Sequence, residues 1–233
     1  MYRTEFETGA LLDTDPAEGR RQFPMPSVSR GGQRIKRAID FVVASFLLIV
    51  FLPLYVAVAA GVRLSSSGPI FYSQRRVGFG GREIFVYKFR SMRVDADEVL
   101  NTFLDSDAEA MKEWRTYHKL RHDPRITTFG HFIRRTSLDE LPQFWNVVRG
   151  DMSLVGPRPV TAAEKDRYGH FWVEYCAVRP GISGLWQVSG RSRLSYHSRV
   201  QLDAKYVNHW SIWLDFKILL KTISVVIARD GSH

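Results

Sequence analysis

Two nearby stretches organise the chain: Ser137-Leu138-Asp139-Glu140-Leu141-Pro142-Gln143 and Gly150-Asp151-Met152-Ser153-Leu154-Val155-Gly156-Pro157-Arg158-Pro159. Ser137 and Glu140 have the spacing of a capping box, and Pro142 is tolerated only near the first turn of a helix. Gly150 would end that helix, whose apolar residues recur at helical spacing as Leu141, Phe144, Trp145 and Val148. The pattern predicts a helix that begins at Ser137 and ends before Gly150.

Asp139 lies in the first turn of this predicted helix. There the positive end of the helix dipole would keep a carboxylate ionised and would also attract a phosphate. An ionised aspartate beside a phosphate site is a candidate nucleophile. The alternative is an ordinary capped helix with acidic residues in its first turn, and the spacing alone leaves both interpretations open.

Several segments, taken in order, resemble one family of enzymes. They are Lys36-Arg37-Ala38-Ile39-Asp40-Phe41, Tyr87-Lys88-Phe89-Arg90-Ser91-Met92, Asp123-Pro124-Arg125-Ile126, the run from Arg134 to Pro159, and Arg179-Pro180-Gly181-Ile182-Ser183-Gly184. Nearly everything from Arg34 onward resembles the bacterial polyprenyl-phosphate sugar-1-phosphate transferases, the monotopic phosphoglycosyl transferases. Within that family, the chain is most similar to the short form that starts succinoglycan-type exopolysaccharides with galactose-1-phosphate.

The resemblance implies a reaction and assigns roles to residues. A hexose-1-phosphate, with galactose favoured over glucose, would pass from a UDP-sugar to undecaprenyl phosphate, releasing UMP and initiating exopolysaccharide repeat-unit assembly. Asp139 would be the nucleophile that forms a covalent Asp-phosphosugar intermediate, and Glu140 would hold Mg²⁺. Arg134 and Arg158 would bind phosphate. Pro157 and Pro159 flank Arg158 and would hold its backbone in a rigid, extended conformation, which suits a guanidinium that binds phosphate through two hydrogen bonds.

Two further cations lie on one face of a predicted strand. Lys88 and Arg90 alternate with Phe85, Tyr87 and Phe89, so the charged and aromatic side chains point to opposite faces. Two cations on one strand face are either solvated charges or part of a phosphate site, and we include both as candidate substrate-binding residues.

A loop rich in Gly, Ser and Arg over residues 179–193 is the candidate uridine site. Trp186 could stack on a base, and Gln187 could hydrogen-bond to its edge. Arg179 and Arg191 could meet a diphosphate. The position of this loop in the family favours the same assignment.

Composition limits the alternatives. The 233 residues carry a formal net charge of +9, which indicates an anionic partner such as nucleic acid, a membrane surface or a phosphorylated substrate. A hydrophobic content of 45% argues against a disordered basic tail protein. The single cysteine, Cys176, excludes an intrachain disulfide and fits a small core residue in a reducing compartment.

Residues 39–62 are almost wholly apolar, and a helix of that length would be roughly 36 Å long, enough to span a bilayer. Pro53 lies near the middle, where it breaks or kinks a helix. Basic residues flank both ends, as Arg34, Lys36 and Arg37 before the segment and Arg63, Arg75 and Arg76 after it, so the positive-inside rule places both ends in the cytoplasm. A straight span is the alternative to a re-entrant helix broken at Pro53.

The family's re-entrant helix favours the broken form. Its usual Ser-Pro break reads Leu52-Pro53 here, so the proline is kept while the hydroxyl is missing. Asp40 lies near the start of the segment, where burial of an unpaired carboxylate in the membrane would cost free energy. Arg37 or a later basic residue could be its partner.

The remaining patterns predict an α+β fold that is mostly helical with a small β-hairpin. Strands are expected over 70–77 and 83–90, joined by Gly78-Phe79-Gly80-Gly81, and helices over 95–120 and 161–178. We expect a flexible tail over 1–33, a re-entrant membrane helix over 34–64, a cytoplasmic catalytic domain over 65–204 and a membrane-interfacial C-terminal helix over 205–233.

These expectations describe a monotopic protein of the bacterial inner membrane, with its catalytic domain on the cytoplasmic face. The expected partners are a UDP-hexose, undecaprenyl phosphate and the lipid bilayer, and a homo-oligomer is left open. No nucleic-acid recognition motif is found, so no nucleic-acid partner is expected. The alternative from another class is a membrane-tethered basic binding or scaffold protein of an export complex without catalysis.

Overall fold

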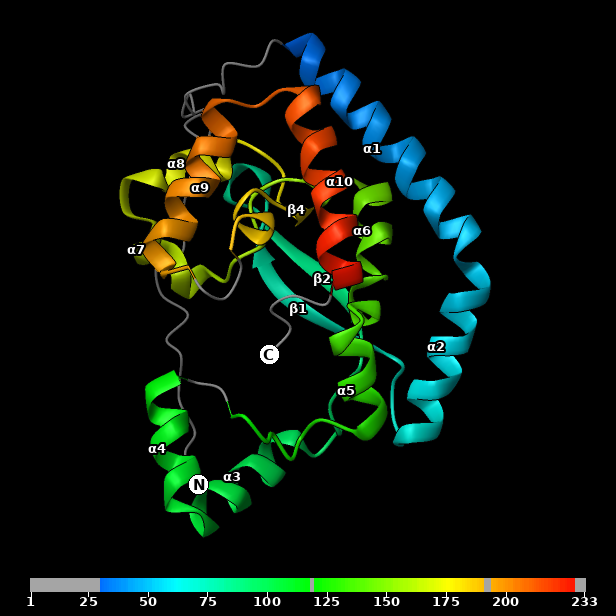
Figure 1. The fold of residues 1–233 in the computed structure, drawn as a ribbon, viewed down its shortest axis with the longest axis vertical. Helices are drawn as coiled ribbons and strands as arrows, with labels where there is room; N and C mark the ends of the chain where they lie inside the picture. The colour runs from blue at the N-terminus through cyan, green and yellow to red at the C-terminus, as the bar shows by residue number, and fades with distance from the viewer. Residues whose placement is uncertain (1–29, 118–119, 191–193, 229–233) are drawn as a thin grey trace, which may run out of the picture.

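The computed structural model describes residues 30–117, 120–190 and 194–228, which form an α+β fold that is mostly helical (Figure 1). The predicted fold class is confirmed at this level. The predicted tail up to residue 29 and the predicted site residue Arg191 lie outside the described residues.

Two helices, α1 (Arg30–Val50) and α2 (Leu52–Ser65), form a bent arm along one side of the molecule (Figure 1). They meet at Phe51 with a bend of 63°. Pro53 lies in the first turn of α2, where its missing N–H is tolerated, so the predicted break is confirmed. Among the described helices, none alone has the length and apolarity needed to cross a bilayer, whereas the bent pair meets that test as a unit.

The arm has one buried side and one exposed apolar side. Its buried side packs on α6 (Gln143–Arg149) and α5 (Thr128–Arg135). Its exposed side carries Ile35, Ile39, Val42, Phe46, Ile49, Val50, Leu52, Val56 and Leu64. Exposed apolar surface of this extent marks contact with a membrane or with another protein.

Asp40 is buried in the inner side of α1 and is fully paired there. Its carboxylate accepts hydrogen bonds from Ser153 Oγ at 2.7 Å and from the Leu154 N–H at 3.3 Å. It also lies 3.8 Å from Lys36 Nζ. Within the described part of the chain the ion-pair partner is therefore Lys36, which precedes Asp40, and neither Arg37 nor a later basic residue, the two alternatives suggested by the sequence, takes that place.

Arg37 instead holds the end of α6. Its guanidinium donates to the backbone carbonyls of Val147 and Val148, while Arg179 Nε donates to the Gly150 carbonyl at 2.8 Å. Carbonyls at a helix C-terminus lack partners within the helix and favour a nearby cation. Two arginines from distant parts of the sequence thus fix the end of α6.

The hairpin consists of β1 (Phe71–Val77) and β2 (Glu83–Phe89), paired antiparallel as predicted. A 3-10 turn over Phe79–Gly81 closes it. Gly80 and Gly81 have φ values of 69° and 77°, a backbone conformation that glycine adopts without steric cost.

Asn146 of α6 pairs with the outer edge of β2 as another strand would. It is fully buried, and its side chain accepts from the Tyr87 N–H at 3.0 Å and donates to the Phe85 carbonyl at 2.6 Å. This double hydrogen bond fixes the hairpin, and with it Lys88, to α6.

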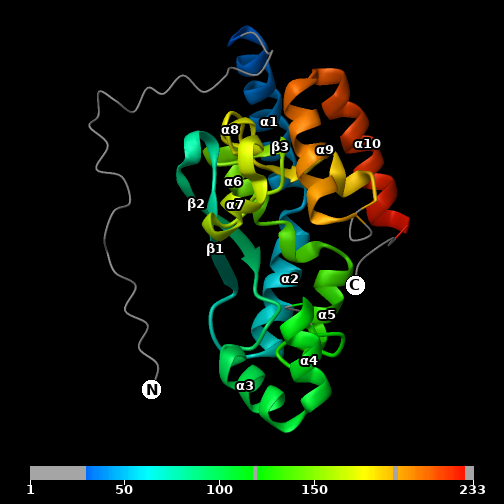
Figure 2. The same ribbon diagram turned by 90° about the vertical axis from the view of Figure 1, so that its left-hand side faces the viewer.

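The single helix predicted over 95–120 is two helices, α3 (Ala96–Ser106) and α4 (Ala108–Tyr117), which lie together at one end of the molecule (Figures 1 and 2). Asp107 between them has an extended backbone, and its carboxylate accepts from the Ala110 N–H at 3.0 Å. An aspartate with this geometry caps the start of a helix, which explains the break.

The capping box predicted at Ser137 is wrong. Ser137 has a left-handed backbone with φ of 57°, and its side chain caps nothing. Leu138–Glu140 form one 3-10 turn, and α6 begins only after Pro142. A capping residue needs an extended backbone, whereas the chain here turns sharply on leaving α5. Gly150, with φ of 89°, ends α6 as predicted.

A short parallel pair, β3 (Ser153–Val155) and β4 (Gly181–Ser183), was not predicted from the sequence. Gly156 lies so close to the chain before β4 that a Cβ on it would be 2.5 Å from the Arg179 carbonyl oxygen. The Gly181 N–H donates to the Pro157 carbonyl at 2.8 Å, which ties the loop that carries Arg158 to β4.

Residues 161–178, predicted as one helix, form 3-10 turns over Ala162–Glu164 and Gly169–Phe171 together with α7 (Lys165–Tyr168) and α8 (Trp172–Cys176). Gly169, with φ of 54°, interrupts the helix. The aromatic side chains pack together as predicted, in a cluster with buried Cys176 that includes Tyr168, Phe171, Trp172 and Tyr175.

The C-terminal part contains a 3-10 turn over Trp186–Val188, α9 (Tyr196–Asn208) and α10 (Ile212–Ala228). The boundary expected at residue 205 therefore falls inside α9. One face of α10 packs through Ile218 into the main core. Its other face exposes Ile212, Trp213, Phe216, Leu220 and Ile223.

Candidate active site

The candidate active site is centred on Lys88, Asp139 and Glu140. Lys88 Nζ of β2 lies 2.6 Å from Glu140 Oε1 and 3.8 Å from Asp139 Oδ2. Asp139 is only 8% exposed, whereas the Glu140 side chain is partly exposed. The hairpin and the 3-10 turn before α6 thus bring one cation against two adjacent carboxylates.

Burial raises the pKa of Asp139 to about 6, although the charges of Lys88 and Arg134 oppose this rise. The neighbouring charge of Glu140 adds to it. The helix end was expected to favour the ionised form, but a single 3-10 turn has too small a dipole to offset the loss of water around a buried carboxylate. Asp139 therefore titrates just below neutral pH, where a nucleophile or a base is useful.

Glu140 behaves differently. Burial acts to raise its pKa, but the attraction and hydrogen bond of Lys88 hold the pKa below its ordinary value. Adjacent carboxylates with pKa values displaced in opposite directions can take different chemical roles. Glu140 remains a fixed negative charge, while Asp139 changes charge within a useful pH range.

Arg134 approaches this pair from the last turn of α5. Its Nε donates to Ser91 Oγ at 2.8 Å. Burial lowers the pKa of Arg134, while the charges of Asp139 and Asp123 raise it. A partly buried guanidinium near Asp139 is suited to bind an anion that reacts there.

A pocket opens beside Glu140, and Arg158 is one of its cations. It is lined by Gln74, Arg76, Val86, Lys88, Glu140, Gln143, Arg158, Pro159, Gly181, Ile182 and Gln187. The Arg158 guanidinium lies 5.8 Å from the centre of the Trp186 ring. The structure therefore brings Lys88, Glu140, Arg158 and Gln187 into one pocket, while Asp139 is not among the lining residues and lies 3.8 Å from Lys88.

Comparison with known proteins identifies the family of this chain. Residues 31–229 match the family described as bacterial sugar transferase. The chain belongs to the bacterial sugar transferase family.

Relatives in this family carry informative names. The UDP-galactose-lipid carrier transferase of Erwinia amylovora is 51% identical over 199 residues, covering 85% of this chain and 42% of the relative. The undecaprenyl-phosphate galactose phosphotransferase of Salmonella typhimurium is 46% identical, covering 88% of this chain and 43% of the relative. The exopolysaccharide production protein ExoY of Rhizobium meliloti is 45% identical, covering 87% of this chain and 89% of the relative. The chain thus spans less than half the length of the first two.

Three polar residues of the sugar transferase pocket were missed by the sequence analysis: Gln74, Arg76 and Gln143. The signal for the first two was present. In the hairpin register Gln74 lies opposite Val86 and Arg76 opposite Ile84, on the face that also carries Lys88. Alternation along β1 places both beside Lys88, whereas the sequence analysis uses Arg76 only as a basic residue that flanks the predicted membrane segment.

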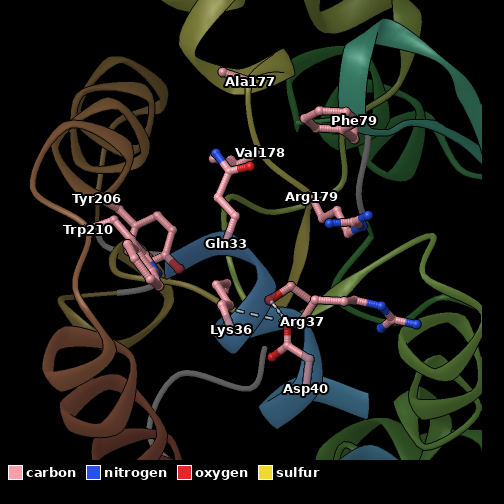
Figure 3. A pocket seen from close by; sticks show the side chains of 11 residues that line it. Gln33, Lys36, Arg37, Asp40, Phe79, Ala177, Val178, Arg179, Tyr206 and Trp210 are labelled. Carbon is pink, nitrogen blue, oxygen red and sulfur yellow. Dashed lines mark hydrogen bonds and ion pairs between the residues drawn. The ribbon is translucent and has the colours of Figure 1, made fainter. Parts of the chain in front are cut away.

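Three predicted cations among the described residues do not line this pocket: Arg134, which lies near Asp139, and Arg90 and Arg179, which lie farther away. Arg90 donates to the backbone carbonyls of Ser66 and Ser67 at 2.8 and 2.7 Å, so it holds the end of α2. Arg179 lies in a second pocket at the start of α1, which shares no lining residue with the first; Figure 3 shows it near Arg37 and Asp40. Alternation along a strand gives the face of Arg90 but not the direction of so long a side chain.

The predicted uridine loop is only partly available at the pocket. Trp186 is 6% exposed, and the guanidiniums of Arg158 and Arg199 lie 5.8 and 4.9 Å from the centre of its ring. A ring this buried is not an open platform for a base. Gln187 lines the pocket, and its Nε2 donates to the Ile182 carbonyl at 3.2 Å.

The residues at the site fit a magnesium ion of the kind that substrate phosphates help to hold. Among the residues that the structure describes, no three His, Cys, Asp or Glu side chains are grouped as a metal cage would require. Mg²⁺ in phosphoryl-transfer sites uses one or two carboxylates and completes its shell with water and substrate oxygens. Glu140, ionised and facing the pocket, is the suitable protein ligand.

Proposed function

We propose that this chain transfers a hexose-1-phosphate from a UDP-sugar to undecaprenyl phosphate at the cytoplasmic face of the bacterial inner membrane. The observation that carries the proposal is the convergence of Asp139, Glu140, Lys88 and Arg158 in a member of the bacterial sugar transferase family. The names of two relatives, which specify galactose and a lipid or undecaprenyl-phosphate carrier, support the substrate classes and favour galactose.

The proposed reaction has two displacement steps at one phosphorus. In the first, an Asp139 carboxylate oxygen bonds to the phosphorus that carries the sugar, and the bond from this phosphorus to the oxygen of UMP breaks. UMP leaves with that oxygen. In the second, an oxygen of undecaprenyl phosphate bonds to the same phosphorus and the bond to Asp139 breaks. The products are the lipid diphosphate sugar and the free carboxylate.

The chain's own residues supply charge and orientation. Lys88 lies against both carboxylates and favours the ionised Asp139 that the first step needs. Arg134 and Arg158 are proposed to stabilise the charge that develops on the phosphate oxygens. Mg²⁺, held through Glu140, would neutralise the substrate phosphates.

The membrane assignment rests on the bent arm. Large apolar side chains are exposed on both α1 and α2, and α10 exposes another apolar face. We propose that the arm enters and leaves the bilayer on one side and that α10 lies in the interface. This arrangement would keep the lipid phosphate at the level of Asp139 without lifting it out of the headgroup layer.

The direct test is an assay of UMP release by the purified full chain with undecaprenyl phosphate and a panel of UDP-sugars. We expect activity with UDP-galactose, and mass spectrometry without the lipid acceptor should find a hexose-phosphate adduct on the peptide that contains Asp139. Asp139→Asn should lose both signals. Substantial UMP release by this variant would exclude the covalent route, and no release from any UDP-sugar would favour the non-catalytic scaffold.

A further inference from the structure

Among the residues that the structure describes, three cations line the pocket, and the carboxylates of the site pair closely with one of these three. Lys88 is held by Glu140 at 2.6 Å and lies 3.8 Å from Asp139. Arg158 is exposed and lies over Trp186. The third cation, Arg76 of β1, lines the same pocket and has no role in the reaction described above.

The Arg76 side chain is held in place from two sides. Its Nη2 donates to Gln74 Oε1, and its Nη1 lies 3.5 Å from Glu164 Oε1. Glu164 is fixed in turn, because it accepts from the Thr161 N–H at 2.9 Å and from the Tyr196 hydroxyl at 3.0 Å. The guanidinium is therefore oriented before any ligand arrives, which reduces the entropy lost on binding.

Burial is the main cause that lowers the pKa of Arg76, and the like charge of Arg158 lowers it further. The charge of Glu164 acts to raise this pKa, which is nevertheless lowered on balance. Two guanidiniums whose charges act on each other in one pocket are stabilised when an anion lies between them. A diphosphate, with oxygens on two phosphorus atoms, can accept hydrogen bonds from two guanidiniums at once.

We propose that Arg76 and Arg158 together bind the diphosphate of the nucleoside diphosphate-sugar, with Arg76 as a substrate-binding residue. The inference rests on the proposed function and adds to it the second cation for the diphosphate. It also gives Gln74 and Glu164 a role, which is to position Arg76.

The neighbouring residue provides a matched control. Arg75 points to the opposite face of the hairpin, where its guanidinium lies 5.9 Å from the centre of the Phe85 ring and its side chain is 75% exposed. The Arg76 side chain is 16% exposed. Replacing either arginine by alanine removes one positive charge from β1, but only Arg76→Ala removes it from the pocket.

The test measures binding of UDP and of uridine to the full chain in the Asp139→Asn background, which prevents turnover. Because a charge-assisted hydrogen bond is removed, Arg76→Ala should weaken UDP binding by about ten- to a hundred-fold and uridine binding by less than about threefold. Arg75→Ala should leave both affinities within about twofold of the background protein, since exposed charges contribute little. Unchanged UDP affinity in Arg76→Ala would overturn the inference.

Two further variants separate binding from folding. Glu164→Gln removes the charge of the ion-pair partner of Arg76 but keeps a side chain of the same shape with an oxygen that can face the guanidinium, and Gln74 also still holds it. Arg76 should therefore stay positioned, and UDP should bind within about threefold of the background protein. If Arg76 only supported the fold through Glu164, this variant would lose UDP binding as Arg76→Ala does. Arg76→Lys keeps the charge without the planar fork, and we expect an intermediate loss of UDP affinity even if the alanine variant fails to fold.

Steady-state kinetics show whether Arg76 binds the phosphates of the UDP-sugar or the phosphate of the lipid. They also separate this inference from the proposed function. In the otherwise native chain, Arg76→Lys should raise the KM for the UDP-sugar and leave the KM for undecaprenyl phosphate unchanged. The opposite result would assign Arg76 to the lipid phosphate and overturn the inference, while the proposed reaction would stand. UDP binding that depends on Arg76 in a chain without transferase activity would overturn the proposed function alone.

Discussion

The Tyr55 hydroxyl of α2 donates to the backbone carbonyl of Leu141, the residue that follows Glu140. This hydrogen bond joins the bent arm directly to the turn that carries the two carboxylates. Tyr55 lies two positions after Pro53, so the break in the arm also sets where this hydroxyl falls. Tyr55 and Leu141 pack in one cluster with buried Phe89 of β2. The proposed membrane segment thus contacts the turn that carries Asp139 and Glu140.

Removal of this hydroxyl should slow turnover without unfolding the chain. Tyr55→Phe removes one of two hydrogen bonds that the Leu141 carbonyl accepts, the other coming from the Phe144 N–H at 3.1 Å. We expect the loss to loosen the 3-10 turn at a cost of about 1 kcal/mol. We expect kcat for UMP release to fall about five- to tenfold, while the KM for the UDP-sugar changes little. Tyr72→Phe, at a half-exposed hairpin position, is the control and should be neutral. Equal kcat values for the two variants would show that the link to α2 does not act on the site.

Asp139→Asn should make the folded state more stable as it abolishes activity. The folded-state pKa of Asp139 is about 6, above its ordinary value of 3.8. Folding therefore favours the protonated form, and the stability of the native chain falls as pH rises from about 4 to about 6, then stays level. At pH 7 the ionised side chain costs about 3 kcal/mol, which the neutral amide removes.

Thermal unfolding in detergent at pH 4 and pH 7 measures this effect. The variant and the native chain should differ little at pH 4, and the variant should melt several degrees higher at pH 7. A lower melting temperature for Asp139→Asn at pH 7 would mean that the carboxylate stabilises the fold, contrary to the burial argument.

The rate of the first step should depend on pH through the same group. Because the nucleophile must be ionised, formation of the adduct should fall by about tenfold per pH unit below pH 6. Lys88 lowers the pKa of Asp139, so Lys88→Met should move the midpoint of the profile upward. Single-turnover UMP release measured from pH 5 to pH 8.5 gives both midpoints. A midpoint unmoved by Lys88→Met would assign the titration to another group.

Glu140→Gln should lose most activity, and EDTA should have the same effect on the native chain. The amide keeps the shape of Glu140 but removes the charge that we propose binds Mg²⁺. Mg²⁺ should restore the EDTA-treated protein and Ca²⁺ should not, because the larger ion does not keep octahedral geometry around phosphates. Full activity in EDTA would remove the metal from the mechanism.

Pro53→Ala should change the topology of the arm. The substitution restores helix continuity, worth roughly 3 kcal/mol, and would let a straightened segment cross the bilayer in part of the population. Single cysteines at Ser29 and Ser67 in a Cys176→Ser background can be probed with a membrane-impermeant thiol reagent in spheroplasts. Both should be protected in the native arm, and the Ser29 position should become labelled after Pro53→Ala. Labelling of that position without the proline change would indicate an ordinary span.

The sequence predicted the features that local residue patterns determine. Pro53 breaks the arm, Gly150 ends α6, and the glycines at 80 and 81 close the hairpin, because each residue acts on its own backbone. Ser137 shows where such reasoning fails. Its capping spacing was present, but the sharp turn out of α5 imposes a left-handed backbone.

Contacts between distant segments were harder to predict. The parallel pairing of β3 with β4, the edge contact of Asn146 with β2 and the presence of Arg76 in the pocket all depend on how separate elements pack. The direction of a long side chain is equally hard to predict from the sequence. Arg90 and Arg179 donate to backbone carbonyls away from the pocket, although their positions in the sequence suggested phosphate binding.

The pairing of Lys36 with Asp215, at 2.6 Å across 179 residues of sequence, has a consequence for biosynthesis. At about 5–20 residues per second, translation delivers the partner of Lys36 roughly 10–35 seconds after Lys36 itself. The hydrogen bond of Arg37 to Val147 of α6 likewise forms only after another 110 residues have been translated. Until α6 and β3 have been translated, α1 lacks the helix and the strand that bury its polar side. The inner face of α1 is therefore completed only when α10 has been made, and truncation before Asp215 should remove the ion pair of Lys36 with Asp215 while the contacts of Arg37 and Asp40 with α6 and β3 remain.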